Sequence, residues 1–201
     1  MDPDAVEIRV LGCLIEKQRT TPDAYPLSLN ALRLACNQTT NRDPIVEYDE
    51  RTIKAALDRM SIRGWTRFAS GASSRALKYR HLLDEALSLS EEELSLLAVL
   101  MLRGPQTLGE LKQRSERLHR FESLPEVAQR IDHLIERELA VRLERRPGQK
   151  EERYAQLLGG DGPEETDMQT PAEDGGDRLT AIEERLNRLE RAFDDLRARL
   201  D

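Results

Sequence analysis

The chain has 201 residues, of which 38% are hydrophobic and 34% are charged, and its net charge is −7. This length allows one large domain or two small ones, and the composition is typical of a soluble, helix-rich protein. No run of about 20 apolar residues occurs, which argues against a membrane-spanning helix, and the first residues lack the basic and apolar regions of an export signal. We therefore expect a cytoplasmic protein without a membrane partner.

The charge is unevenly distributed along the chain. Residues 159–201 contain 13 acidic and 6 basic residues, whereas residues 1–158 contain 25 of each. Within this neutral part, residues 1–83 are slightly basic and residues 84–158 slightly acidic. The acidity therefore belongs to the tail, and neither half has the strongly basic composition of a dedicated nucleic-acid binder.

An internal repeat organises the chain before the tail. Ile8 and Leu11 match Leu94 and Leu97 at helical spacing, and later apolar residues match in the same order at smaller offsets. Each copy is predicted to be three helices followed by two strands. The difference in residue number between matching positions decreases along the chain, which indicates that the second copy has shorter connections between its elements.

In chain order, the third helices are predicted at about 49–63 and 124–137. Helix starts are marked in the second copy by capping boxes, in which a hydroxyl residue is followed three positions later by Glu, at Ser90, Thr107 and Ser123. Turns at 70–74 and 146–150 precede returning strands at 75–83 and 151–158. Three helices ending in a β-hairpin are the winged-helix plan. We predict a mainly α fold with small β-hairpins (α+β), with winged-helix domains at 1–85 and 86–158.

The tail divides into two parts. Residues 159–177 are rich in Gly, Pro and acid, which predicts a disordered acidic linker. Residues 178–201 carry a heptad seam that predicts a coiled-coil helix and a parallel homodimer. The alternative is that this helix docks on its own globular domains. The predicted interface positions are Leu179, Ile182, Leu186, Leu189, Phe193, Leu196 and Leu200.

Catalysis has little support in the sequence. His81, His119 and His133 have no carboxylate or Cys at ligand spacing, and no phosphate loop or nucleophile motif occurs. Cys13 and Cys36 lie in apolar helical patterns and are expected to be buried, reduced thiols. The interpretation is a non-enzymatic protein with no cofactor and no metal.

Binding to double-stranded DNA is the leading hypothesis. In helix-turn-helix proteins the recognition helix enters the major groove, and neighbouring cations contact phosphate. The first copy offers polar and basic residues before and on its third helix and on its hairpin. The predicted nucleic-acid-binding residues are Gln38, Thr39, Asn41, Arg42, Arg51, Lys54, Arg67, Arg75 and Lys78.

Other features of the same region favour a different class of function. Glu47, Asp49 and Glu50 crowd the start of the third helix, where they would cap it and repel phosphate. Asn37 and Asn41 fit a purely structural role in the preceding loop. A protein-interaction adaptor that uses tandem winged helices without binding DNA is therefore the alternative.

Three segments resemble a known family. They are TTPDAYPLSLNALRLACNQTTNRDP at 20–44, LMLRGPQTLGEL at 100–111 and PGQKEERYAQLL at 147–158. Together they resemble the YceH family of uncharacterised bacterial proteins, and the resemblance extends over residues 5–158. It implies two winged-helix domains, and it implies no ligand or catalytic residue.

Overall fold

The computed structural model describes residues 2–69, 77–145 and 149–159. The chain divides into two compact units, residues 1–162 and 163–201, and the described residues all belong to the first. The predicted linker beyond Gly159, the predicted heptad helix at 178–201 with its interface residues, and Arg75 lie outside the described residues.

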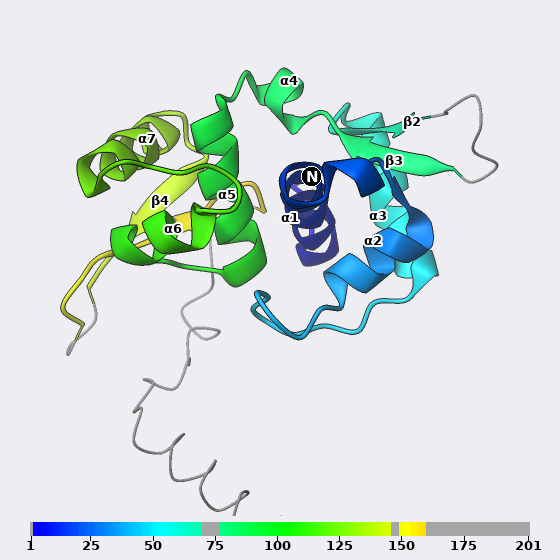
Figure 1. The fold of residues 1–201 in the computed structure, drawn as a ribbon, viewed down its shortest axis with the longest axis horizontal. Helices are drawn as coiled ribbons and strands as arrows, with labels where there is room; N and C mark the ends of the chain where they lie inside the picture. Colours follow the sequence, from blue (N-terminus) through cyan, green and yellow to red (C-terminus); the bar gives the residue numbers. More distant parts are fainter. Residues whose placement is uncertain (1, 70–76, 146–148, 160–201) are drawn as a thin grey trace, which may run out of the picture. The chain divides into compact units, whose positions relative to one another are not determined.

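The described residues form an α+β structure with seven α-helices and two small antiparallel sheets (Figure 1). In chain order the elements are α1 Ala5–Thr20, the 3-10 turn η1 Pro22–Ala24, β1 Leu27–Ser28, α2 Leu29–Cys36, α3 Glu50–Ile62, β2 Thr66–Ala69, β3 Lys78–His81, α4 Leu83–Leu87, α5 Glu91–Arg103, α6 Leu108–Ser115, α7 Leu124–Glu136, β4 Ala140–Leu143 and β5 Arg153–Gln156.

The same order of elements occurs twice. Helices α1, α2 and α3 precede the hairpin β2–β3, and helices α5, α6 and α7 precede the hairpin β4–β5, with the short α4 between the two sets. The third helices agree with their predicted ranges to within one residue at each end. Three short elements were not predicted: η1, α4 and the strand β1, which pairs Leu27 with Tyr79 and gives the first sheet the order β1-β3-β2.

The helix starts follow the capping chemistry that the sequence indicates, with one exception. Ser90 and Thr107 form complete capping boxes with Glu93 and Glu110. Ser123 accepts a hydrogen bond from the Glu126 N–H, but the Glu126 carboxylate accepts from the backbone of Glu122 instead of Ser123. The third box is therefore only half formed, because a neighbouring N–H takes the carboxylate.

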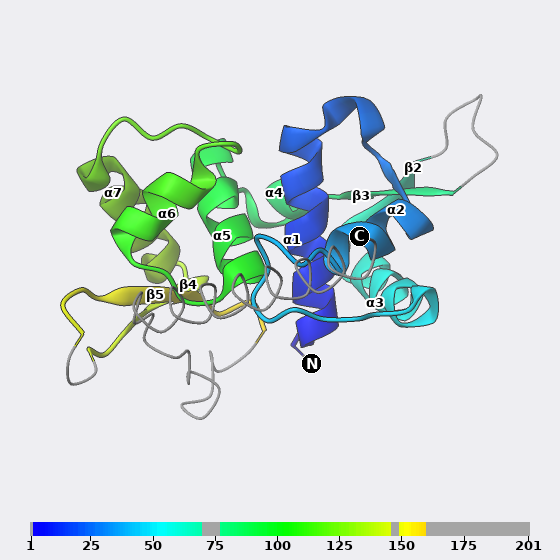
Figure 2. The same cartoon turned by 60° about the horizontal axis from the view of Figure 1, so that its bottom comes forward.

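The two halves share one core. Helix α1 packs along α5, and the two helices lie side by side in both views (Figures 1 and 2). Gly12 makes this close approach possible, because a Cβ added there would lie 2.9 Å from the side chain of Leu102. The buried apolar residues of both halves accordingly form one continuous cluster. None of the helices in the described ranges is long and apolar enough to cross a membrane.

Candidate nucleic-acid interface

The structure separates the predicted binding residues into two groups. Gln38, Thr39, Asn41 and Arg42 lie in the connection between α2 and α3, whereas the other described candidates lie on α3 and the hairpin β2–β3. Gln38, Thr39 and Asn41 line a hollow together with Arg117 of the second half, whereas Arg42 and the second group do not line it. The structure therefore does not bring all the predicted residues together at one hollow.

The connection from α2 to α3 runs to the second half before it returns. The Asp43 N–H donates to the carbonyl of Leu102 at 2.8 Å, and Arg9 donates to the carbonyl of Pro44 at 2.6 Å. Asn41 also accepts a hydrogen bond from Arg103 at the end of α5. These contacts fasten the connection to α1 and α5, which explains why its polar residues do not extend the surface of α3.

Arg42 has a structural role in this connection. Its side chain has no exposed surface, and its guanidinium lies 2.6 Å from the Glu16 carboxylate. It also donates to the carbonyl of Ala35 and to the amide oxygen of Gln38. Burial opposes ionisation of Glu16, but the hydrogen bonds and charge of Arg42 outweigh it and lower the Glu16 pKa. Arg42 is therefore not available to a phosphate, and its assignment to the binding surface is corrected.

Helix α3 presents its cations differently along its length. Arg51 is exposed in the first turn. Lys54, one turn later, forms an ion pair with Asp58 and lies over the ring of Phe68, 5.9 Å from its centroid. The hydrogen bond from Lys54 to Asp58 raises the pKa of this lysine. Lys54 thus joins α3 to the hairpin, while Arg51 is left facing solvent.

The hairpin carries its cations on one face. Strand pairing places Arg67 opposite Arg80, and Ala69 opposite Lys78. Because side chains alternate along a strand, Arg67, Lys78 and Arg80 share the face opposite Phe68. Arg80 forms an ion pair with Glu85. Arg67 and Lys78 are the free cations among the described residues of this hairpin face.

Ion pairing separates the cations of the first half into two classes. Arg51, Arg67 and Lys78 form no ion pair with any described residue. Arg9 donates instead to a backbone carbonyl. The remaining described cations of residues 2–85 all form ion pairs; they are Lys17, Arg19, Arg33, Arg42, Lys54, Arg59, Arg63 and Arg80.

Of the acidic residues that the sequence places at the start of α3, Asp49 caps the helix. The Asp49 carboxylate accepts from the Thr52 N–H at 2.7 Å, and these hydrogen bonds to Thr52 lower its pKa. Glu50 lies 4.0 Å from Arg33 on α2. Asn37 is likewise structural, since its amide exchanges two hydrogen bonds with the backbone of Tyr48. The start of α3 is thus stabilised by groups that do not favour phosphate.

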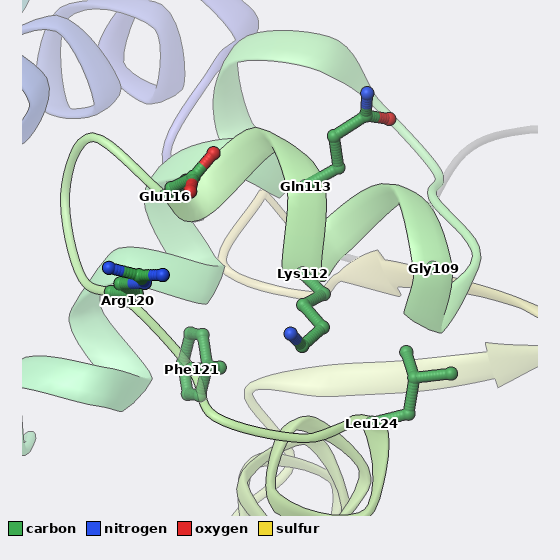
Figure 3. Close-up of a pocket in the computed structure, with 7 residues that line it drawn as sticks. All are labelled: Gly109, Lys112, Gln113, Glu116, Arg120, Phe121 and Leu124. Atoms are coloured by element: carbon green, nitrogen blue, oxygen red, sulfur yellow. The ribbon is translucent and has the colours of Figure 1, made fainter.

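The second half carries free cations in a place that the sequence analysis overlooked. Lys112, Arg117 and Arg120 form no ion pair with the described residues, and they lie on α6 and the connection to α7. Lys112 and Arg120 border a hollow of about 340 Å³, in which Lys112 extends toward Phe121 and Leu124 (Figure 3). The available signal was the local charge, because residues 112–120 contain four basic residues and one acidic residue.

Two titratable groups of the described residues, Glu93 and His81, are buried. Glu93 is 2% exposed. It accepts hydrogen bonds from the Ser90 backbone and contacts His133 of α7; burial opposes its ionisation, but these contacts lower its pKa. His81 is buried, which lowers its pKa to about 4, and its Nε2 lies 2.6 Å from Gln18. These contacts join helices and strands that are distant in sequence.

The cysteines and the potential metal ligands are the remaining reactive groups of the described residues. Cys13 and Cys36 are free and buried, as expected from their apolar surroundings. Across residues 2–69, 77–145 and 149–159, no group of three or more His, Cys, Asp or Glu residues is arranged to hold a metal ion.

Comparisons with known proteins show the family of this chain. A UPF0502 protein of Geotalea daltonii is 48% identical over 187 residues, which cover 92% of this chain and 85% of the relative. A UPF0502 protein of Solibacter usitatus is 45% identical over 199 residues, covering 96% of each chain. The family model described as "Protein of unknown function, DUF480" matches residues 4–149. The chain belongs to this family.

Proposed function

We propose that the protein is a non-enzymatic, tandem winged-helix protein that binds double-stranded DNA through its first half, as a dimer. Support for the winged-helix assignment comes from the repeated order of three helices and a hairpin. In that plan α3 is the recognition helix and β2–β3 is the wing. The duplex would take α3 in its major groove, and the outer face of the wing would follow the neighbouring phosphates.

The observation that carries the proposal is the free charge of Arg51, Arg67 and Lys78. Most cations of this half are used to hold the fold together, whereas these three are not neutralised by any described residue. A cation that forms no ion pair can neutralise a phosphate without first losing a partner. They also lie on the two elements that a winged helix uses to contact DNA.

The proposal is tested by the salt dependence of DNA affinity. Fluorescence anisotropy of the full-length protein with a random duplex is measured between about 50 and 200 mM salt, where phosphate contacts weaken steeply. The variant with Arg51→Ala, Arg67→Ala and Lys78→Ala is expected to reduce the slope of log affinity against log salt by about 3, since each phosphate contact contributes about 1. An unchanged slope would contradict the proposal.

A second candidate function, protein binding, is favoured by exposed apolar residues in the same half. Ile62 at the end of α3 is 88% exposed, and Leu77 before β3 is 61% exposed. Leu34 on α2 and Phe68 on β2 are also exposed. Exposed apolar side chains are available for contacts with a protein partner. Pull-down with the wild-type protein and with a variant carrying Leu34→Ser and Ile62→Ser would distinguish this function, because the variant should lose partners without losing DNA affinity.

A further inference from the structure

We infer that the hollow beside the α2–α3 connection is a binding site for a small phosphorylated molecule. This hollow has a volume of about 450 Å³. It lies between the end of α1, the connection that follows α2, and Arg117 beyond the end of α6. Its lining is polar throughout: Glu16, Lys17, Thr20, Thr21, Asn37, Gln38, Thr39, Thr40, Asn41 and Arg117.

The side-chain amides of Gln38 and Asn41 have NH2 groups that are available to a ligand in the hollow. The Gln38 amide oxygen accepts a hydrogen bond from Arg42, and the Asn41 amide oxygen accepts one from Arg103. An arginine can only donate, so these contacts fix the amides with their oxygens toward the guanidinium groups. The two NH2 groups have no partner among the described residues. Thr39 and Thr40 add two exposed hydroxyls that form no hydrogen bond in the described ranges.

The charge of the hollow is positive. Glu16 is the acidic residue of the lining, and both of its oxygens accept hydrogen bonds from the buried guanidinium of Arg42. Lys17 lies 3.2 Å from the same carboxylate. Arg117 is exposed and has no ion-pair partner in the described part of the chain. The two cations of the lining, Lys17 and Arg117, therefore outnumber its single carboxylate, which the buried Arg42 also neutralises.

These features select a ligand with many acceptor atoms and a negative charge. A carboxylate has two oxygens, whereas a terminal phosphate presents three and carries up to two charges. Four uncharged side-chain donors and a free arginine match the phosphate better. The concave form and limited volume of the hollow suit a small molecule and not a duplex. Arg117 would contact the phosphate directly, and Arg42 would hold Glu16 and Gln38 in place behind it.

A ligand bound in this hollow would also affect the first half of the protein. The uncharged donors of the hollow lie in the connection between α2 and α3, and α3 begins at Glu50. Asn41 has a left-handed backbone, with φ of 61°, between the two threonines and Arg42. A ligand held by Thr39, Thr40 and Asn41 would therefore stabilise the connection in the form seen here. This inference does not depend on DNA binding by α3.

The test uses the full-length protein and two probes, inorganic phosphate and glucose 6-phosphate, at constant ionic strength. Binding is followed by amide NMR shifts of residues 38–41 and by the rise in Tm with ligand concentration. We expect Arg117→Ala to weaken binding of either probe at least tenfold. The matched control is Arg120→Ala, which removes an equally free cation from the other hollow and should change affinity less than twofold. A second variant, Thr39→Val with Thr40→Val, should also weaken binding.

Three results would overturn the inference. One is the absence of any shift in residues 38–41 with either probe. Another is an equal loss of affinity in Arg117→Ala and Arg120→Ala, which would show a general charge effect. The third is that Arg117→Ala lowers affinity for duplex DNA while phosphate binding is absent in the wild-type protein, which would assign this surface to nucleic acid.

Discussion

The two halves of the protein share one order of elements but place their free cations differently. In the first half, the free cations Arg51, Arg67 and Lys78 lie on the third helix and the hairpin. In the second half, Lys112, Arg117 and Arg120 lie on the second helix and the connection that follows it, and Lys150 lies between the strands of the hairpin. Arg130 of α7 and Arg137 at its end pair with Glu92 and Glu93 of α5. A shared fold therefore does not give the halves a shared binding surface, because ion pairing decides which cations remain available.

The largest expected effect concerns Arg42 and its free counterpart Arg117. Arg42→Ala leaves the Glu16 carboxylate without its buried partner and should lower the free energy of unfolding by about 3 kcal/mol. Arg117→Ala removes an exposed, unpaired cation and should change it by less than about 0.5 kcal/mol. Urea denaturation of both variants at pH 7 measures the two effects. Equal losses would show that Arg42 is not the structural residue described here.

The packing of α1 on α5 can be broken at Gly12. Gly12→Val introduces atoms into a space already filled by Leu102 and Met101, and overpacking of this kind should cost about 2 kcal/mol. Gly109→Ala in α6 is the matched control, because its added Cβ meets only Thr107 Oγ1 at 3.9 Å and should leave stability unchanged or slightly raised. Thermal unfolding followed by circular dichroism gives both values. A stable Gly12→Val would mean that the halves pack less closely than described.

The returning strands differ at their last residue, where the first half has His81 and the second has Gln156. Burial lowers the pKa of His81 to about 4, below its unfolded value of about 6.5. The unfolded chain therefore binds the proton more readily, and stability should fall by about 2 kcal/mol between pH 7 and pH 5. The His81→Gln variant, denatured at pH values over the same range, should not show this loss of stability. An unchanged pH dependence would place the titrating group elsewhere.

The smallest expected effect concerns the helix that precedes each connection. Thr107 caps α6 in a reciprocal box with Glu110, whereas Ser28 caps α2 by a single hydrogen bond to the Ala31 N–H. Thr107→Ala should cost about 1 kcal/mol, because it removes the hydroxyl that accepts from the Glu110 N–H and leaves the box half formed. Ser28→Ala should cost less. Urea midpoints of the two variants provide the comparison, and the reverse order would contradict the role given to the reciprocal bond.

Much of the fold could be predicted from the sequence because its causes are local. Apolar spacing located the third helices, and hydroxyl residues followed by Glu located the starts of α5 and α6. The repeat predicted the matching hairpins, and the resemblance to an uncharacterised bacterial family is confirmed at the level of the family. The short elements β1 and α4 were missed because neither has a pattern long enough to distinguish it from a loop.

The candidate site could be predicted only in part because its arrangement depends on contacts between distant residues. The position of the α2–α3 connection is fixed by Asp43 and Leu102, which are 59 positions apart in the chain. The sequence shows that residue 42 is an arginine, but its burial against Glu16 follows from packing. The basic connection of the second half was overlooked for a different reason, because the acidic average over residues 84–158 concealed a local excess of cations.

The most direct test of the proposed DNA-binding surface compares the free cations of the two halves. Affinity for a random duplex is measured at about 50 mM salt, where phosphate contacts are strongest, for the wild-type protein and for two triple variants. The account predicts that Arg51→Ala, Arg67→Ala and Lys78→Ala together reduce affinity at least tenfold. Lys112→Ala, Arg117→Ala and Arg120→Ala together should reduce it less than threefold. Equal losses, or a loss confined to the second variant, would contradict the assignment of DNA binding to the first half.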